Sequence, residues 1–139
     1  MADKYWNNKR NSSYSRNESA QMINKPLSVF YQDKAELYLE NGAAYRQAEK
    51  LKFVKVHQVR KYLTVIKECA ETSNFTEARN KLYSLVPLAA YNAGRDRNLN
   101  GLYDFIHSHI NRDSIQSKED IEVLDELFTS IIAYHKYLA

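Results

Sequence analysis

The chain has 139 residues, a length that suits one domain. Three glycines and two prolines are too few for the frequent turns of a strand-rich fold, so the composition favours helices. The net charge of +3 is modest, and the single cysteine, Cys69, excludes an internal disulfide and indicates a reducing compartment. Because no apolar run resembles a signal peptide or a bilayer-spanning segment, we expect a cytoplasmic protein.

Residues 1–25 are poor in apolar side chains and rich in Asn and Ser, with five basic and two acidic residues. This composition predicts a flexible, weakly basic tail, whose end is marked by Pro26. The tail is open to two interpretations, an inert extension or an arm that touches RNA. The folded domain is expected over residues 26–139.

Beyond Pro26, apolar residues recur at helical spacing. The expected buried face comprises Phe30, Leu37, Ala44, Ala48 and Leu51. The dipeptide Asn41-Gly42 interrupts this segment and divides it into two helices, because glycine costs about 1 kcal/mol inside a helix. Residues 52–56 are expected to form a short link to the next helix.

That next helix is expected over residues 57–71. Its buried side should comprise Val59, Leu63, Ile66 and Ala70, with Tyr62 and Cys69 at one edge. A further helix begins with Ser73 or Asn74 as its N-cap and is expected to continue to Gly94, a good C-terminal stop. Pro87 lies inside this pattern and predicts a kink, because proline removes one backbone hydrogen bond.

A shorter helix is expected over residues 99–110, and the last helix over residues 118–138. Ser117 and Asp120 are spaced as in a capping box at the start of this last helix. The whole pattern predicts an all-α fold, a compact bundle of five to six helices.

Charge is segregated along the chain. Residues 46–61 hold six basic residues and one acidic residue, whereas residues 113–126 hold six acidic residues and one basic residue. A positive face indicates an anionic partner, and a negative face opposite it would let copies of the protein attract one another.

No residue pattern predicts catalysis or a bound cofactor or metal. His135 falls inside the apolar stripe of the last helix and is interpreted as a buried, hydrogen-bonded structural residue, whereas Lys136 lies about 100° away and can reach an anion. His107 and His109 are two positions apart and cannot chelate one metal. Cys69 has no CxxC partner. No Arg is followed by a His at the spacing of helical HEPN-type ribonucleases, so we do not expect an enzyme.

The basic residues are the candidate RNA-binding site, because Lys and Arg held near the spacing of phosphates contact a nucleic-acid backbone. An ordinary solvated basic face fits the same pattern equally well. The candidates are Lys52, Lys55, Arg60, Lys61, Arg79, Arg95, Arg97 and Lys136.

Three segments resemble the small subunit of type III-A CRISPR effector complexes, the Csm complexes. These are "HQVRKYL" at 57–63, "LVPLAAYNAGR" at 85–95 and, most specifically, "FTSIIAYHKYLA" at 128–139. Two departures stand out. Leu88 stands after Pro87 where a lysine is expected, so that basic contact has no counterpart in this chain, and Thr129-Ser130 replace an acidic-plus-small pair.

The resemblance implies a helical, non-catalytic protein present in several copies, without a cofactor. Such copies stack head to tail along the guide RNA–target RNA duplex, beside the RNA-cleaving backbone subunit, and contact the large polymerase-like subunit at one end. On matching positions, the family's RNA contacts correspond to Arg60, Lys61 and Arg95; the other candidates rest on charge and proximity. Two alternatives stay open, namely a stand-alone helical adaptor whose basic face meets an acidic protein and a nuclease with an unrecognised site.

Overall fold

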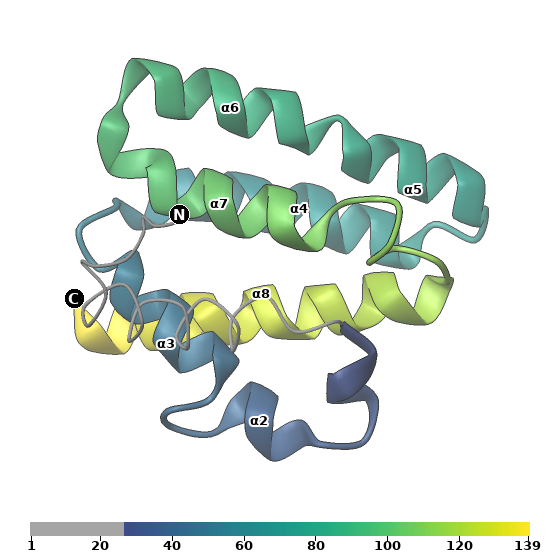
Figure 1. Cartoon of the computed structure of the whole chain (residues 1–139), viewed down its shortest axis with the longest axis horizontal. Coiled ribbons are helices and arrows are strands. Elements are labelled where there is room, and N and C mark those ends of the chain that lie inside the picture. Colours follow the sequence, from purple (N-terminus) through teal and green to yellow (C-terminus); the bar gives the residue numbers. More distant parts are fainter. Residues whose placement is uncertain (1–26) are drawn as a thin grey trace, which may run out of the picture.

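The computed structural model describes residues 27–139, which fold into a bundle of helices (Figure 1). The expected tail over residues 1–25 lies outside the described residues. In chain order the elements are η1 (Leu27–Tyr31, a 3₁₀ helix), α2 (Lys34–Tyr38), α3 (Ala43–Lys50), α4 (Val56–Glu71), α5 (Phe75–Tyr83), α6 (Leu85–Arg95), η2 (Arg97–Leu99, a 3₁₀ helix), α7 (Asn100–His109) and α8 (Lys118–Leu138). The predicted all-α bundle is confirmed.

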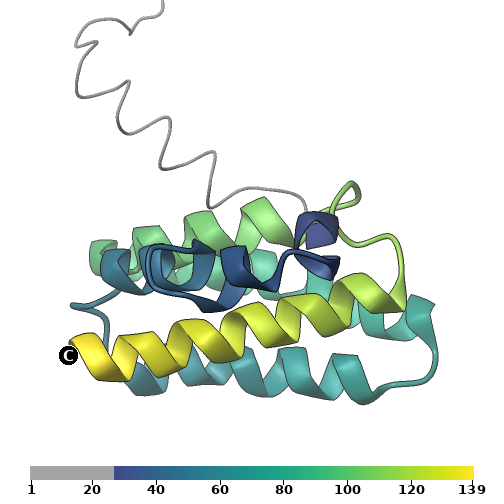
Figure 2. The same cartoon turned by 90° about the horizontal axis from the view of Figure 1, so that it is seen from below.

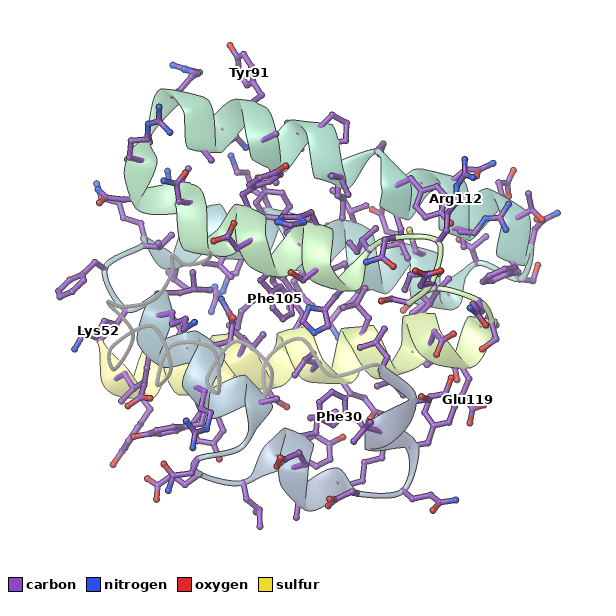
Figure 3. All side chains as sticks on the ribbon, in the orientation of Figure 1. Phe30, Lys52, Tyr91, Phe105, Arg112 and Glu119 are labelled. Carbon is purple, nitrogen blue, oxygen red and sulfur yellow. The ribbon has the colours of Figure 1, made fainter. Side chains whose placement is uncertain are left out.

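Helix α8 is the central element of the bundle. It runs nearly the whole length of the folded part, between α4 on one side and the α2–α3 segment on the other (Figure 2). Helices α4 and α8 are antiparallel. Lys67, near the end of α4, contacts Asp125 near the start of α8, whereas Val54, just before α4, contacts His135 near the end of α8. Helix α7 packs against α6, and the Phe105 and Phe128 rings lie 5.6 Å apart between α7 and α8 (Figure 3).

The connections between the long helices gather at the two ends of the bundle. The α3–α4 connection, η2 and the last turn of α8 lie at one end, on the left in Figure 1. The α4–α5 and α7–α8 connections lie at the opposite end. Segments far apart in the sequence therefore meet at each end.

The predicted break at Asn41-Gly42 is confirmed. Asn41 adopts a positive φ of 70°, which Asn tolerates better than most residues, and Gly42 is the N-cap of α3. The apolar stripe predicted for this region is buried throughout. It packs against α8, and this tertiary contact stabilises the short helices η1, α2 and α3.

The two glycines Gly42 and Gly94 should respond oppositely to alanine. A Cβ at Gly42 would lie 2.4 Å from the Glu36 carbonyl oxygen, so Gly42→Ala should lower the free energy of unfolding by about 1–3 kcal/mol. A Cβ at Gly94 meets nothing within 4 Å, and alanine favours helix, so Gly94→Ala should raise it by about 0.5–1 kcal/mol. Thermal melts of both variants measure this difference. A stabilised Gly42→Ala would contradict the close packing between α2 and α3.

The buried face of α4 is rotated from the predicted one. Tyr62 and Cys69, expected at an edge, are fully buried, while Leu63 and Ala70 are only partly buried. The reason is that α4 packs against α5 as well as α8, and Asn92 of α6 donates a hydrogen bond to the Tyr62 hydroxyl at 2.8 Å. The apolar periodicity predicted one buried face of α4, whereas in the fold α4 is covered by α8 on one side and by α5 on another.

The long helix expected up to Gly94 is two helices, and the predicted kink at Pro87 is replaced by a break at Ser84. Proline has no N–H to donate to the Tyr83 carbonyl four residues earlier, and this places the interruption one turn before Pro87. The prediction of Gly94 as a stop is wrong. No glycine has a positive φ among the described residues, and α6 continues to Arg95 and is capped by Asp96 in an extended conformation.

The capping box predicted at the start of α8 is confirmed. The Asp120 backbone N–H donates to the Ser117 side chain, and the Asp120 carboxylate accepts from the Ser117 backbone N–H. The Tyr31 hydroxyl also donates to this carboxylate, which ties η1 to α8. Burial, helped by this hydrogen bond, raises the pKa of the Tyr31 hydroxyl.

Candidate nucleic-acid interface

Seven of the eight predicted contact residues lie at or near one end of the bundle. Lys52 marks this end in Figure 3, and the start of α4, the end of α6, η2 and the last turn of α8, which carry the others, lie there in Figure 1. All seven side chains are exposed. We call this set the basic end; it comprises Lys52, Lys55, Arg60, Lys61, Arg95, Arg97 and Lys136.

A pocket at the basic end brings together two of the three contacts that the resemblance suggested. Lys61 from α4 and Arg95 from α6 line the same hollow of about 300 Å³. Its wall also includes the amides of Gln58 and Asn92, neutral donors of the kind that accompany cations at phosphate contacts. The remaining lining residues are Tyr62, Asp96, Leu99 and Leu102.

The amides of this pocket were missed by sequence reasoning. Gln58 and Asn92 carry no charge, and they lie more than thirty positions apart in the sequence. Only the packing of α4 near α6 shows that they share a wall with Lys61 and Arg95.

Within residues 27–139, no carboxylate forms a salt bridge with any residue of the basic end. The salt bridges between lysine and carboxylate within residues 27–139 are made by three other lysines, Lys34, Lys67 and Lys81. Lys67 shares a flank of α4 with Arg60, but it bonds to Asp125 at 3.1 Å, so the second half of that flank is neutralised by α8. Among residues 27–139, the cations in the first half of α4 therefore have no carboxylate partner, whereas Lys67 in its second half has one.

The eighth candidate, Arg79, is not brought together with the other seven. It lines a separate pocket with Arg112, which Figure 3 places at the end of the bundle opposite Lys52. Its guanidinium carbon lies 5.5 Å from the Phe75 ring centroid and 5.8 Å from that of Tyr83. Arg95 follows Arg79 by sixteen residues, which lie mostly in α5 and α6 and correspond to a helical rise of roughly 24 Å, so proximity in the sequence does not become proximity in space.

His135 is the buried, hydrogen-bonded residue that its place in the apolar stripe predicted. Its side chain is only 3% exposed, and Nε2 lies 2.9 Å from the Leu51 carbonyl oxygen and 2.7 Å from that of Val54. Both partners are acceptors, so Nε2 carries the proton and donates. The histidine thus ties the last turn of α8 to the connection that carries Lys52.

The cysteine and the two other histidines considered as catalytic or metal-binding residues do not form a site. Cys69 is fully buried, and burial raises the pKa of its thiol. His109 is buried whereas His107 is exposed, in keeping with side chains that point in different directions. In the described part of the chain, no group of three or more metal-ligating side chains is placed to hold a metal ion. Nor does any helix there have the length and hydropathy needed to cross a membrane.

Together, the fold and this end of the molecule define a small all-α protein with exposed cations at one end that have no carboxylate partner among residues 27–139. The family model described as Csm2 Type III-A matches residues 33–139. The chain therefore belongs to this family and is a small subunit of a type III-A CRISPR effector complex, as the three sequence segments indicated. Searches of the curated proteins and of the solved structures found no match to the chain.

Proposed function

We propose that the protein binds the sugar-phosphate backbone of the guide RNA–target RNA duplex through the basic end, in the cytoplasm and without chemistry of its own. The observation that carries this proposal is the pocket whose wall includes Lys61, Arg95 and two neutral amides, with Asp96 as its one carboxylate. Cations with no carboxylate partner in the described chain lose little when they bind phosphate, because no ion pair has to be broken first.

The same arrangement supports association between copies. Glu119, at the start of α8, lies at the end of the bundle opposite Lys52 (Figure 3). Attraction between exposed carboxylates such as Glu119 and the cations at the basic end of a second copy would favour head-to-tail stacking. We propose that several copies stack along the RNA in this way, beside the backbone ribonuclease subunit and in contact with the large polymerase-like subunit.

Backbone binding of this kind should depend steeply on salt. With about five phosphate contacts, the slope of log affinity against log salt concentration should be near −3.5 on single-stranded RNA. A filter-binding titration with two oligonucleotides of equal length and unrelated sequence measures the slope, and both should give the same affinity. A strong preference for one sequence would contradict backbone recognition, and a slope near zero would favour an adaptor that binds an acidic protein. RNA cleavage by the purified protein with added metal would contradict the non-catalytic assignment.

A further inference from the structure

Phe53 is the most exposed large apolar side chain among the described residues. It is 84% exposed and lies in the turn between α3 and α4. Its neighbours Lys52 and Lys55 are exposed cations, and the Lys52 ammonium lies 5.4 Å from the centroid of the Phe53 ring. Single exposed apolar residues are common on protein surfaces, so exposure alone does not mark a site.

The turn that carries Phe53 is firmly held. The side chains of Leu51 and Val54, on either side of it, are buried in the core, and the Val54 N–H donates to the Leu51 carbonyl oxygen at 2.9 Å. His135 donates to the carbonyl oxygens of the same two residues. The fold thus anchors both ends of the turn and leaves Lys52 and Phe53 between them facing solvent, in a preorganised position.

We propose that Phe53 is a stacking surface for an unpaired nucleobase, with the neighbouring lysines contacting phosphates. This inference rests on the proposed RNA binding and adds a base contact to it. Aromatic rings beside cations are the usual means of holding single-stranded nucleic acid, since every base presents a face for stacking. The surrounding positive charge favours RNA over the apolar pocket of a protein as the partner of this ring.

The test compares two ligands of equal length, a single-stranded RNA and an oligonucleotide with abasic sites that keeps the phosphates but lacks the bases. Phe53→Ala should bind the RNA about tenfold more weakly than the unchanged protein, with the same salt slope. Its affinity for the abasic ligand should be unchanged. Phe53→Trp should keep the RNA affinity, whereas Phe53→Leu, which is apolar but not aromatic, should lose most of it.

A matched control is Leu39→Ala, because Leu39 is also a large apolar residue, 60% exposed, but lies beside Glu40 rather than lysines. This variant should bind both ligands normally. Melting temperatures of both alanine variants should stay close to that of the unchanged protein, since neither side chain is buried.

The outcomes separate this inference from the proposed function. If the unchanged protein binds neither ligand, the proposed RNA binding itself fails, and the stacking inference with it. Should it bind both while Phe53→Ala binds the RNA normally, stacking is overturned and backbone binding survives. Stacking is also overturned if Phe53→Ala loses affinity equally for the RNA and for the abasic ligand, or if Phe53→Leu binds the RNA with full affinity.

Discussion

Replacing Lys61 and Arg95 together by glutamine is expected to weaken RNA binding about 25-fold at 0.1 M salt. Each lost phosphate contact removes about 0.7 from the salt slope on single strands, which corresponds to about fivefold in affinity at this concentration. The log–log slope should therefore become shallower by about 1.4. Glutamine is uncharged and has a helix propensity close to that of lysine and arginine, and both positions are exposed, so the melting temperature should not fall. Filter binding over a range of salt concentrations measures both quantities.

The matched control is Arg79→Gln with Arg112→Gln, which removes the same charge at the opposite end of the bundle. Its RNA affinity should stay within about twofold of the unchanged protein, since charges separated by more than about 10 Å are largely screened at this salt concentration. Equal losses from the two pairs would mean that binding follows net charge, and the basic end would then have no special role. A larger loss from the control pair would move the RNA site to the other end of the molecule.

Replacing His135 by alanine is expected to lower the free energy of unfolding by about 3 kcal/mol. The substitution leaves a cavity and removes the imidazole donor from the Leu51 and Val54 carbonyl oxygens. For a domain of this size, the melting temperature should fall by roughly 10 °C. A thermal melt followed by circular dichroism measures the change, and the exposed neighbour in Lys136→Gln should melt as the unchanged protein does.

Two further substitutions separate hydrogen bonding from packing at this position. His135→Gln retains an N–H donor on a side chain of similar reach, so it should recover part of the lost stability. His135→Phe fills the space but cannot donate, and it should remain destabilised because the nearby carbonyl oxygens lose their donor. A phenylalanine variant as stable as the unchanged protein would show that volume alone matters there.

The positions of most helices were predictable because local signals determine them. The Asn41-Gly42 break and the Ser117–Asp120 capping box each depend on a few neighbouring residues, and both were confirmed. The apolar repeat likewise placed His135 on the buried side of α8. The prediction failed at Gly94, because a glycine can also keep a helical backbone, and α6 continues past it to Arg95.

The sequence by itself determined an all-helical fold, the separation of basic from acidic segments and, through three short motifs, the family. Only the tertiary structure decided which cations meet. It placed Lys61 and Arg95 on the wall of one pocket, placed Arg79 in a pocket at the other end of the bundle, and supplied the Leu51 and Val54 carbonyl oxygens as partners of His135. Helical periodicity specifies the direction in which a side chain points around the axis of its own helix. The distance between two helices depends instead on how their buried faces pack, and no single segment of the sequence encodes that packing.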